Sequence, residues 1–408
     1  MKTAFLQARS VVLMCAALAC GWPAVVQAGN TTTLPKNIFI LDASWVDATT
    51  EVGWDVARRP QPLLQGIDRY EPGGGLQGTI TAQPVANFRL VVPQILYGLT
   101  DELTLALAVP IVTSRTIDPH LGWTPGDYQP SLGRPYSQDD FWQWAKSMGQ
   151  KKPGIFTADA EPADMVIGLR WRPPQPAFLE KAGVKVALAM QGAVPTGRAQ
   201  DPEELVAAGT TVWDLHNYGD LEAHLGFDRP FESGGVTRLN LGLDLYYSWL
   251  RPREMVSPTG IKNPLLLTYS PYIGKTWTLD PGDFLGVTAM VELVPIVGPT
   301  WASFISGRKI ERARAFPPLL MVSVGHTYVG VGQTHFESDS RIWSWDRAKL
   351  WKPGDKKTVK LGAELSLLRL GLPLQIYGGY RNQEWVPGRN TRAANIATVG
   401  ARLMLRFW

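Results

Sequence analysis

The sequence predicts an all-β fold, a transmembrane antiparallel β-barrel of about 14 strands within a range of roughly 12 to 16. Three observations support this prediction: an export signal, period-two alternation of apolar residues in long segments, and a final strand that ends on aromatic residues. Downstream of the signal, no uninterrupted apolar run approaches the ~18 residues that a spanning helix needs. These features favour a barrel over a periplasmic or secreted protein.

The N-terminus has the three parts of a secretory signal peptide. Lys2 and Arg9 form a basic region, and residues 11–28 contain no charged residue. Val26-Gln27-Ala28 offers small or apolar residues where a signal peptidase reads them. We therefore expect cleavage after Ala28, which makes residues 1–28 a signal peptide and residues 29–408 the barrel.

Both cysteines of the chain lie inside the predicted signal peptide. Cys20 raises a lipoprotein alternative, but Ala17 stands where such signals usually carry a larger aliphatic residue. With Cys15 and Cys20 removed, disulfides and thiolate metal sites are excluded. Loss of Lys2 and Arg9 also lowers the formal net charge of +4 by two, and that balance does not point to nucleic acid.

The predicted strands alternate between apolar and polar faces. In 238–249, Leu and aromatic residues at odd positions oppose polar or small residues at even positions. The same pattern recurs in 37–48, 102–111, 184–194, 220–228, 284–294 and 358–367. About ten residues is the length that a tilted strand needs to cross a bilayer, whereas strands of a soluble β-sandwich usually have five or six.

The connections alternate in length. Short links at 98–101, 232–235 and 280–283 predict periplasmic turns, and long links at about 114–162, 196–217, 251–262 and 298–316 predict outer loops. With both termini in the periplasm the strand number must be even. This requires 37–48 as the first strand and a poorly apolar eleventh strand near 334–345.

The final strand matches the signal that directs barrels to their assembly machinery. Val399, Ala401, Leu403, Leu405 and Phe407 share one face, and polar or small residues share the other. The residues assigned to this signal are Thr398, Gly400, Leu403, Leu405, Phe407 and Trp408. The alternative is an edge strand in a soluble sheet.

Aromatic residues gather in the longest predicted loop, at about 114–162. They are candidates for a ligand-binding or constriction loop, because flat apolar side chains suit the capture of hydrophobic ligands. They are Trp123, Tyr128, Tyr136, Phe141, Trp142 and Trp144. The alternative is that the loop packs on its own aromatics over the barrel mouth.

Charged residues of both signs fall on the predicted lumen face. They are Arg89, Arg170, Lys185, Asp220, Glu222, Arg238, Asp244, Glu292, Lys360, Glu364, Arg381 and Arg402. Charged rings can set pore selectivity, but a mixed set can also cross-link and stiffen a narrow barrel. The lack of a strong excess of either sign argues against a dedicated cation or anion pore.

The sequence predicts no catalytic residues, no metal site and no cofactor. None of the five histidines has metal-ligand spacing, and no serine has a nucleophile signature. We therefore expect a barrel that is not an enzyme. Its expected partners are outer-membrane lipid, the barrel-assembly machinery and a small hydrophobic or aromatic solute.

Tyr97-Gly98-Leu99-Thr100-Asp101-Glu102-Leu103-Thr104-Leu105 resembles a recurrent segment of one outer-membrane barrel family, and 34–39 and Pro195-Thr196-Gly197 are similar to that family as well. That family is named for meta-pathway phenol degradation. The resemblance implies a barrel distantly similar to long-chain fatty-acid transporters, with uptake of hydrophobic or aromatic molecules. Those transporters carry an N-terminal plug. The roughly eight residues before the first strand here are too few for one, so we expect a loop to plug the lumen.

Taken together, these features predict a bacterial outer-membrane channel or transporter for small hydrophobic or aromatic compounds. A general-diffusion porin is the first alternative. A barrel enzyme and a structural barrel follow it.

Overall fold

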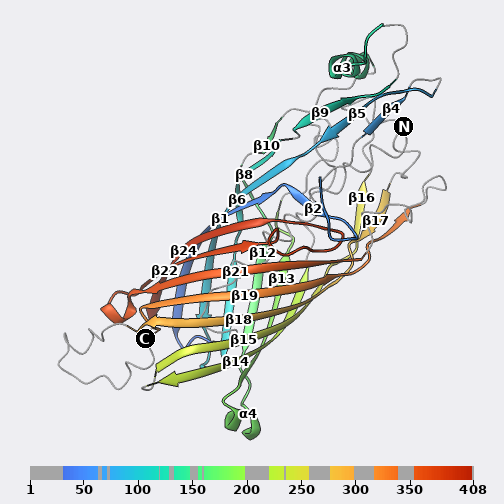
Figure 1. The fold of residues 1–408 in the computed structure, drawn as a ribbon. Helices are drawn as coiled ribbons and strands as arrows, with labels where there is room; N and C mark the ends of the chain where they lie inside the picture. Colours follow the sequence, from blue (N-terminus) through green and yellow to red (C-terminus); the bar gives the residue numbers. More distant parts are fainter. Residues whose placement is uncertain are drawn as a thin grey trace.

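A computed structural model gives the fold of this 408-residue chain (Figure 1). It describes residues 31–406 except 63–66, 71–73, 119, 128–132, 148–154, 159, 198–219, 234–235, 257–275, 298–316 and 339–352. The predicted signal peptide, Phe407 and Trp408 lie outside the described residues. Within the described part, no helix is long and apolar enough to cross a membrane.

Twelve strands form a closed antiparallel barrel. In ring order they are β1 (Ile38–Thr50), β6 (Val85–Gly98), β7 (Leu103–Ala108), β12 (Met165–Trp171), β13 (Lys185–Val194), β14 (Leu221–Ser233), β15 (Val236–Trp249), β18 (Phe284–Ile296), β19 (Leu320–Val331), β21 (Gly354–Ser366), β22 (Leu374–Asn382) and β24 (Asn395–Arg406). The ring closes because β1 pairs with β24 on one edge and with β6 on the other. Closure leaves no unpaired sheet edge in the wall.

Shorter strands extend beyond the ring at its upper right in Figure 1. β8 (Ile111–Asp118) continues the line of β7 along β6 and also pairs with β10 (Phe156–Ala158) and β11 (Glu161–Pro162). The remaining strands form three small sheets: β2 (Val52–Trp54), β3 (Pro60–Pro62) and β23 (Thr391–Arg392); β4 (Ile67–Tyr70), β5 (Leu76–Ala82) and β9 (Leu121–Pro125); β16 (Arg253–Val256), β17 (Thr276–Asp280) and β20 (His335–Ser338). The helical elements of the described residues are α3 (Gln138–Ser147), α4 (Ala177–Ala182) and the 3-10 turn η6 (Leu367–Leu370).

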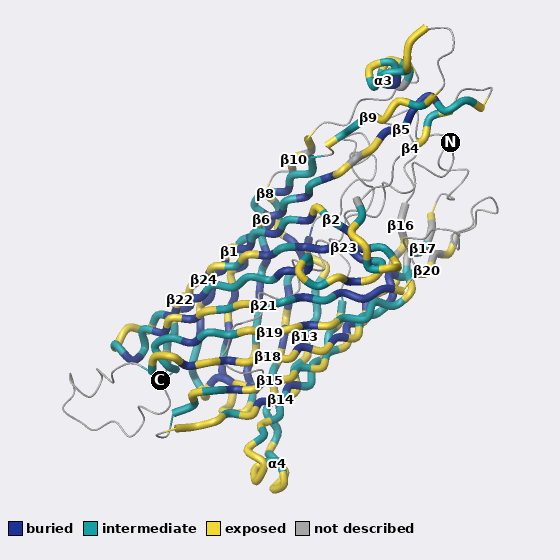
Figure 2. Tube along the Cα trace, in the orientation of Figure 1, coloured by how far each residue is buried: buried dark blue, intermediate teal, exposed yellow. Residues whose placement is uncertain are grey.

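Buried and exposed residues alternate along the barrel strands, as Figure 2 shows. The exposed set on the outer phase is apolar and aromatic. It includes Leu41, Trp45, Leu105, Trp171, Leu188, Leu243, Tyr247, Trp249, Val287, Tyr328, Leu361, Ile376, Val399 and Leu403. A soluble protein does not leave so continuous an apolar belt in water, whereas a lipid bilayer would cover it. The belt and the closed ring therefore place this barrel in the bacterial outer membrane.

Both ends of the described chain lie at the same end of the barrel. Ile38 at the start of β1 pairs with Arg406 at the end of β24. In outer-membrane barrels this end faces the periplasm, and the end with the longer connections faces outward. The small sheets and α3 therefore belong to the extracellular side.

The predicted number of about 14 strands is too high by two, although 12 lies inside the predicted range. β15 pairs directly with β18, and β19 pairs directly with β21, so neither gap holds another spanning strand. The described part of the predicted eleventh strand, His335–Ser338, forms β20 in a small extracellular sheet. It is too short and too polar to cross a bilayer.

Two predicted connections also change sides. The link 280–283 precedes the extracellular end of β18, so it is not a periplasmic turn. The strands that flank 298–316 meet that link at the periplasmic end, so it does not join them on the outside. Both errors have one cause. An outer link at 251–262 followed by a periplasmic turn at 280–283 implies a spanning strand between them, and β15 and β18 pair directly without one. The side of each following link is therefore inverted as far as the predicted strand near 334–345.

Candidate functional site

The lumen changes chemical character along the barrel axis. On β1 the inner-phase residues Asp42 and Ser44 lie toward the periplasm, and Val46 and Ala48 lie toward the outside. Running the other way on β6, Phe88, Leu90 and Val92 are followed by Gln94. The extracellular half of this side is therefore apolar. A polar band follows it, and a smaller apolar cluster of Leu34, Ile40 and Leu96 lies at the periplasmic end.

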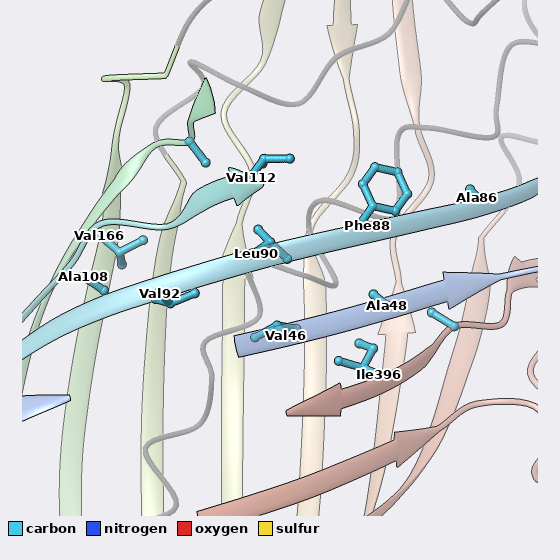
Figure 3. Close-up of a cluster of buried hydrophobic side chains, with 12 residues drawn as sticks. Val46, Ala48, Ala86, Phe88, Leu90, Val92, Ala108, Val112, Val166 and Ile396 are labelled. Atoms are coloured by element: carbon cyan, nitrogen blue, oxygen red, sulfur yellow. The ribbon is translucent and has the colours of Figure 1, made fainter. Parts of the chain in front are cut away.

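Twelve buried side chains form the apolar part, which we call the inner apolar patch (Figure 3). They come from β24, β1, β6, β7, β8 and β12 or from residues next to these strands. They are Val46, Ala48, Ala86, Phe88, Leu90, Val92, Ala108, Val112, Ala163, Val166, Ala394 and Ile396. A water-filled barrel carries polar residues on its inner phase. An ion in contact with this wall would lose hydration without gaining a polar partner, whereas an apolar molecule would not pay that cost.

A polar cluster occupies the wall formed by β13, β14 and β15. His224 lies between two carboxylates, with Nε2 at 2.7 Å from Glu222 Oε1 and Nδ1 at 3.0 Å from Asp244 Oδ2. Tyr246 stacks on the imidazole, with ring centroids 5.4 Å apart. Both ring nitrogens must donate to satisfy these two acceptors, so the geometry is that of an imidazolium.

A second charged cluster holds the seam where the barrel closes. Arg402 on β24 donates from Nε to Asp42 Oδ2 at 2.9 Å and from Nη1 to Glu364 Oε2 at 3.0 Å. Tyr377 donates to Asp42 at 2.7 Å, and Gln375 donates to Glu364 at 2.9 Å. All five side chains are buried, and they tie β1, β24, β22 and β21 together.

Residues 31–37, which we call the N-terminal strap, cross the periplasmic end of the lumen. The backbone N–H and the hydroxyl of Thr31 both donate to Asp228 Oδ2, at 2.6 and 2.7 Å. Asp228 lies on β14, and β6, β7, β12 and β13 separate that strand from β1 on one side of the ring. The strap is held at its base by the N–H of Leu34, which donates to Thr104 Oγ1 at 2.7 Å.

The strap reaches into the lumen, a position that the sequence did not predict for the residues before the first strand. It is too short to form a folded plug, but an extended segment covers more distance per residue than a folded one. Gly98 permits its passage, because a Cβ at that position would lie 2.1 Å from the Pro35 carbonyl oxygen. Arg170 also reaches it and donates to the Thr32 carbonyl at 3.2 Å.

Most of the charged residues assigned to the lumen from the sequence lie on the inner phase. Glu292, Glu364 and Arg402 are buried there, and Lys185 and Arg238 are exposed at the periplasmic ends of their strands. The others on this phase are Arg170, Glu222, Asp244, Lys360 and Arg381, and Asp220 directly precedes β14.

Arg89 was assigned to the wrong face. It lies on the outer phase of β6, where Nε is 3.0 Å from Asp47 Oδ2 and both side chains are substantially exposed. The prediction failed because β6 does not alternate between an apolar outer face and a polar inner face. Its extracellular half is apolar on the inner face, and polar side chains lie on the outer face beyond the apolar belt. Asn87 and Thr49 share that outer face and are hydrogen-bonded at 2.8 Å.

The aromatic loop does not narrow the lumen in its described part. Phe141 is buried with Ile80, and Trp123, Trp142 and Trp144 pack against this pair. The cluster joins α3 to the β4–β5–β9 sheet beyond the extracellular end of the ring (Figure 1). Trp123 also donates to the Tyr136 carbonyl at 2.8 Å, and Tyr128 lies outside the described residues. The loop therefore packs on its own aromatics, the alternative that the sequence left open.

The sequence reasoning missed the inner apolar patch and the Thr31–Asp228 contact. A signal for the patch was available, because residues 85–92 are apolar on both phases apart from Asn87 and Arg89. No local signal could pair Thr31 with Asp228, which lies 197 residues away. The described residues contain no group of three or more His, Cys, Asp or Glu that could hold a metal ion.

Comparison with solved structures finds the same fold in an outer-membrane channel from Pseudomonas putida F1. The TM-score is 0.53 at 9% identity, covering 93% of this chain and 100% of that one. The Ralstonia pickettii toluene transporter TbuX gives 0.34 at 9% identity, covering 92% and 90%. A FadL homologue from Pseudomonas aeruginosa gives 0.34 at 10% identity, covering 91% of each chain.

At such sequence identities the likeness shows the barrel fold alone. Of these three matches, the channel from Pseudomonas putida F1 is the one whose TM-score supports a shared fold. No protein-family model and no curated protein matches the sequence. The resemblance to the family named for meta-pathway phenol degradation therefore stays a prediction.

Proposed function

We propose that this barrel takes up small hydrophobic or aromatic compounds across the outer membrane. The observation that carries the proposal is the inner apolar patch, which covers the extracellular half of the wall from β24 through β1 and β6 to β12. A general-diffusion porin needs a wetted inner wall for hydrated solutes. A buried apolar wall instead favours solutes that lose little on leaving water.

The comparisons are consistent with this proposal. The fold is that of an outer-membrane channel from Pseudomonas putida F1. From the family that the sequence resembles we take one suggestion, that aromatic compounds are the solute class to test first.

The test is solute entry into liposomes that contain the purified barrel. We expect toluene-sized aromatic solutes to enter faster than hydrophilic solutes of the same size. Leu90→Gln should reduce aromatic entry about fivefold or more, because an aromatic solute that covers the amide takes it out of water without giving it a partner, at a cost of roughly 1–3 kcal/mol.

Met321→Gln is the matched control. Met321 and Leu90 are each 3% exposed on the inner phase, but Met321 lies on β19 outside the patch. Equal entry of hydrophilic and aromatic solutes, or large unselective ion conductance in planar bilayers, would instead establish a general-diffusion porin.

A further inference from the structure

The outer face of β21 changes from apolar to charged toward its extracellular end. Leu361 belongs to the apolar belt, Val359 follows it outward, and the next residue on this face is Lys357. Lys357 pairs in register with Tyr328 of β19, which is exposed on the same face. Tyrosine has an apolar ring and a polar tip and collects at membrane–water interfaces. This register therefore places Lys357 at the outer boundary of the belt.

Two arginines meet one carboxylate a single step further out on the same face. Asp355 accepts hydrogen bonds from both terminal nitrogens of Arg58, at 2.7 and 2.9 Å. Its Oδ2 also lies 3.3 Å from Nε of Arg389. The carboxylate is 1% exposed, whereas the side chains of Arg58 and Arg389 are 38% and 49% exposed. The arginines therefore cover the acid and keep further N–H donors accessible from outside.

The backbone holds both arginines beside β21. Arg389 and Asp355 exchange two backbone hydrogen bonds of 2.9 Å, so their side chains share one face. Arg58 lies in the turn between β2 and β3 with a left-handed φ of 63°, a conformation that a non-glycine residue adopts only at an energetic cost. Its guanidinium also donates to the Pro387 carbonyl at 3.0 Å. Both guanidinium groups are therefore preorganised on the outer face.

Three cations, which we call the outer basic cluster, carry more charge than their carboxylate neutralises. They are Arg58, Lys357 and Arg389. In the described part of the chain, Asp355 is the carboxylate paired with the two arginines, and Lys357 pairs with none. The neighbouring Arg59 is paired with Asp55 at 2.9 Å and adds no net charge. The surplus of two positive charges complements a phosphate monoester, which carries about −1.5 to −2 at pH 7.

The outer basic cluster lies at the depth of lipid headgroups. Successive residues on one face of a strand are about 6.6 Å apart, and a tilt of about 40° reduces this step to about 5 Å along the membrane normal. Lys357 lies one such step beyond Val359, and Asp355 lies two. The headgroup layer is about 5–7 Å thick on each side of the hydrocarbon core. On β22 the exposed Trp385 packs on Tyr380, with ring centroids 5.8 Å apart, as interfacial aromatics do.

We propose that the outer basic cluster binds a phosphate group on a glycolipid of the outer leaflet. Guanidinium and ammonium groups form charge-assisted hydrogen bonds to phosphate oxygens. Basic pockets at a membrane surface recognise phosphorylated headgroups through the same contacts. The acyl chains of such a lipid would lie against the apolar belt directly below the cluster. This inference concerns the lipid that surrounds the barrel and is independent of the solute that the barrel passes.

The experiment measures binding of diphosphoryl lipid A to the purified barrel in micelles of a neutral detergent, by native mass spectrometry. The unmodified barrel should bind this lipid at least about tenfold more tightly than lipid A from which both phosphates have been removed. Arg389→Gln and Lys357→Gln should each weaken binding of the diphosphoryl lipid about tenfold, the effect of losing one charge-assisted bond. Lys357→Arg should keep the binding.

Arg229→Gln is the matched control, because Arg229 is an exposed cation on the outer phase of β14 at the periplasmic side. It should change binding by less than about twofold. Migration of unheated samples in gels verifies that each variant forms a barrel. Equal binding of the two lipids, unchanged binding in both cluster variants, or an equal loss in Arg229→Gln would overturn the site. Complete competition by 10 mM inorganic phosphate, a concentration of roughly physiological order, would assign the cluster to free phosphate and overturn the lipid.

Discussion

Release of the N-terminal strap should depend on Asp228. In the structure Asp228 accepts two hydrogen bonds from Thr31, and the carboxylate is buried. A hydrogen bond to a charged group contributes roughly 1.5–3 kcal/mol, so Asp228→Ala, which removes two such bonds, should lower the free energy of releasing the strap tip by at least ~3 kcal/mol. At 1.4 kcal/mol per tenfold, release of the tip should become about 100-fold more frequent.

Labelling of a single cysteine measures this release. The mature chain has no cysteine if cleavage follows Ala28, and Thr33 is 7% exposed, so Thr33→Cys reports when this part of the strap leaves the lumen. The substitution removes the hydrogen bond from the Thr33 hydroxyl to the Asp101 carbonyl in every variant of the series alike. A polar thiol reagent should label Cys in the Asp228→Ala background about 100-fold faster than in the Thr33→Cys parent. Thr31→Val keeps the backbone bond and removes the hydroxyl bond, so it should increase the rate only about tenfold.

Arg229→Ala is the control for this series, because Arg229 neighbours Asp228 in sequence but lies on the outer phase with its guanidinium 5.1 Å from the Phe231 ring centroid. If labelling in folded Asp228→Ala stays within about twofold of the parent, the two Thr31 bonds do not hold the strap and the reasoning is refuted.

Three further predictions concern the seam, the final strand and the extracellular cluster. Arg402→Met leaves Asp42 and Glu364 buried without their cation, so urea unfolding in micelles should show that the free energy of unfolding falls by ~3–5 kcal/mol. The triple variant D42N/E364Q/R402M should recover most of this free energy. A fall below about 1 kcal/mol in the single variant would contradict a buried ion cluster. Gly400→Ala places a Cβ 2.4 Å from the Tyr377 ring and should lower the free energy of unfolding by ~1–3 kcal/mol in the same assay. Gly378→Ala should lower it less, because the nearest atom to a Cβ there is 3.7 Å away. Equal losses in the two variants would argue against this packing. Arg134 and Ser137 donate hydrogen bonds to Asp140 at the start of α3, and these bonds hold the pKa of that carboxyl below its usual value. The ordering of α3 that they support should therefore persist above about pH 4 and be lost as the pH falls further. Near-ultraviolet circular dichroism of the Trp cluster should follow that loss, and an Asp140→Asn variant that shows the same acid transition would refute it.

The comparison of β15 with β6 shows how far local pattern determines this fold. β15 alternates strictly, with Leu and aromatic residues outside and Asn240, Asp244 and Ser248 inside, and both of its faces were predicted correctly. β6 is apolar on both phases over its extracellular half, and there the prediction placed Arg89 on the wrong face. Period-two reasoning assumes one wet and one dry face, and this assumption fails where the lumen itself is apolar.

The number of strands could not be read from the sequence because strand pairing is a relation between distant segments. The short stretches around β17 and β20 resemble strands locally, and they are strands, but they pair with each other outside the ring. Only the direct pairing of β15 with β18 and of β19 with β21 excludes them from the wall.

The sequence by itself determined the class of fold, the outward belt, the final strand and most of the inward charges, since each follows from alternation along one strand. Tertiary structure alone decided the closure of the ring, the apolar patch and the strap across the lumen. The physical reason is the same in each case. A strand's own residues fix which of its faces meets lipid, whereas what faces it across the lumen depends on register and closure among strands far apart in the chain.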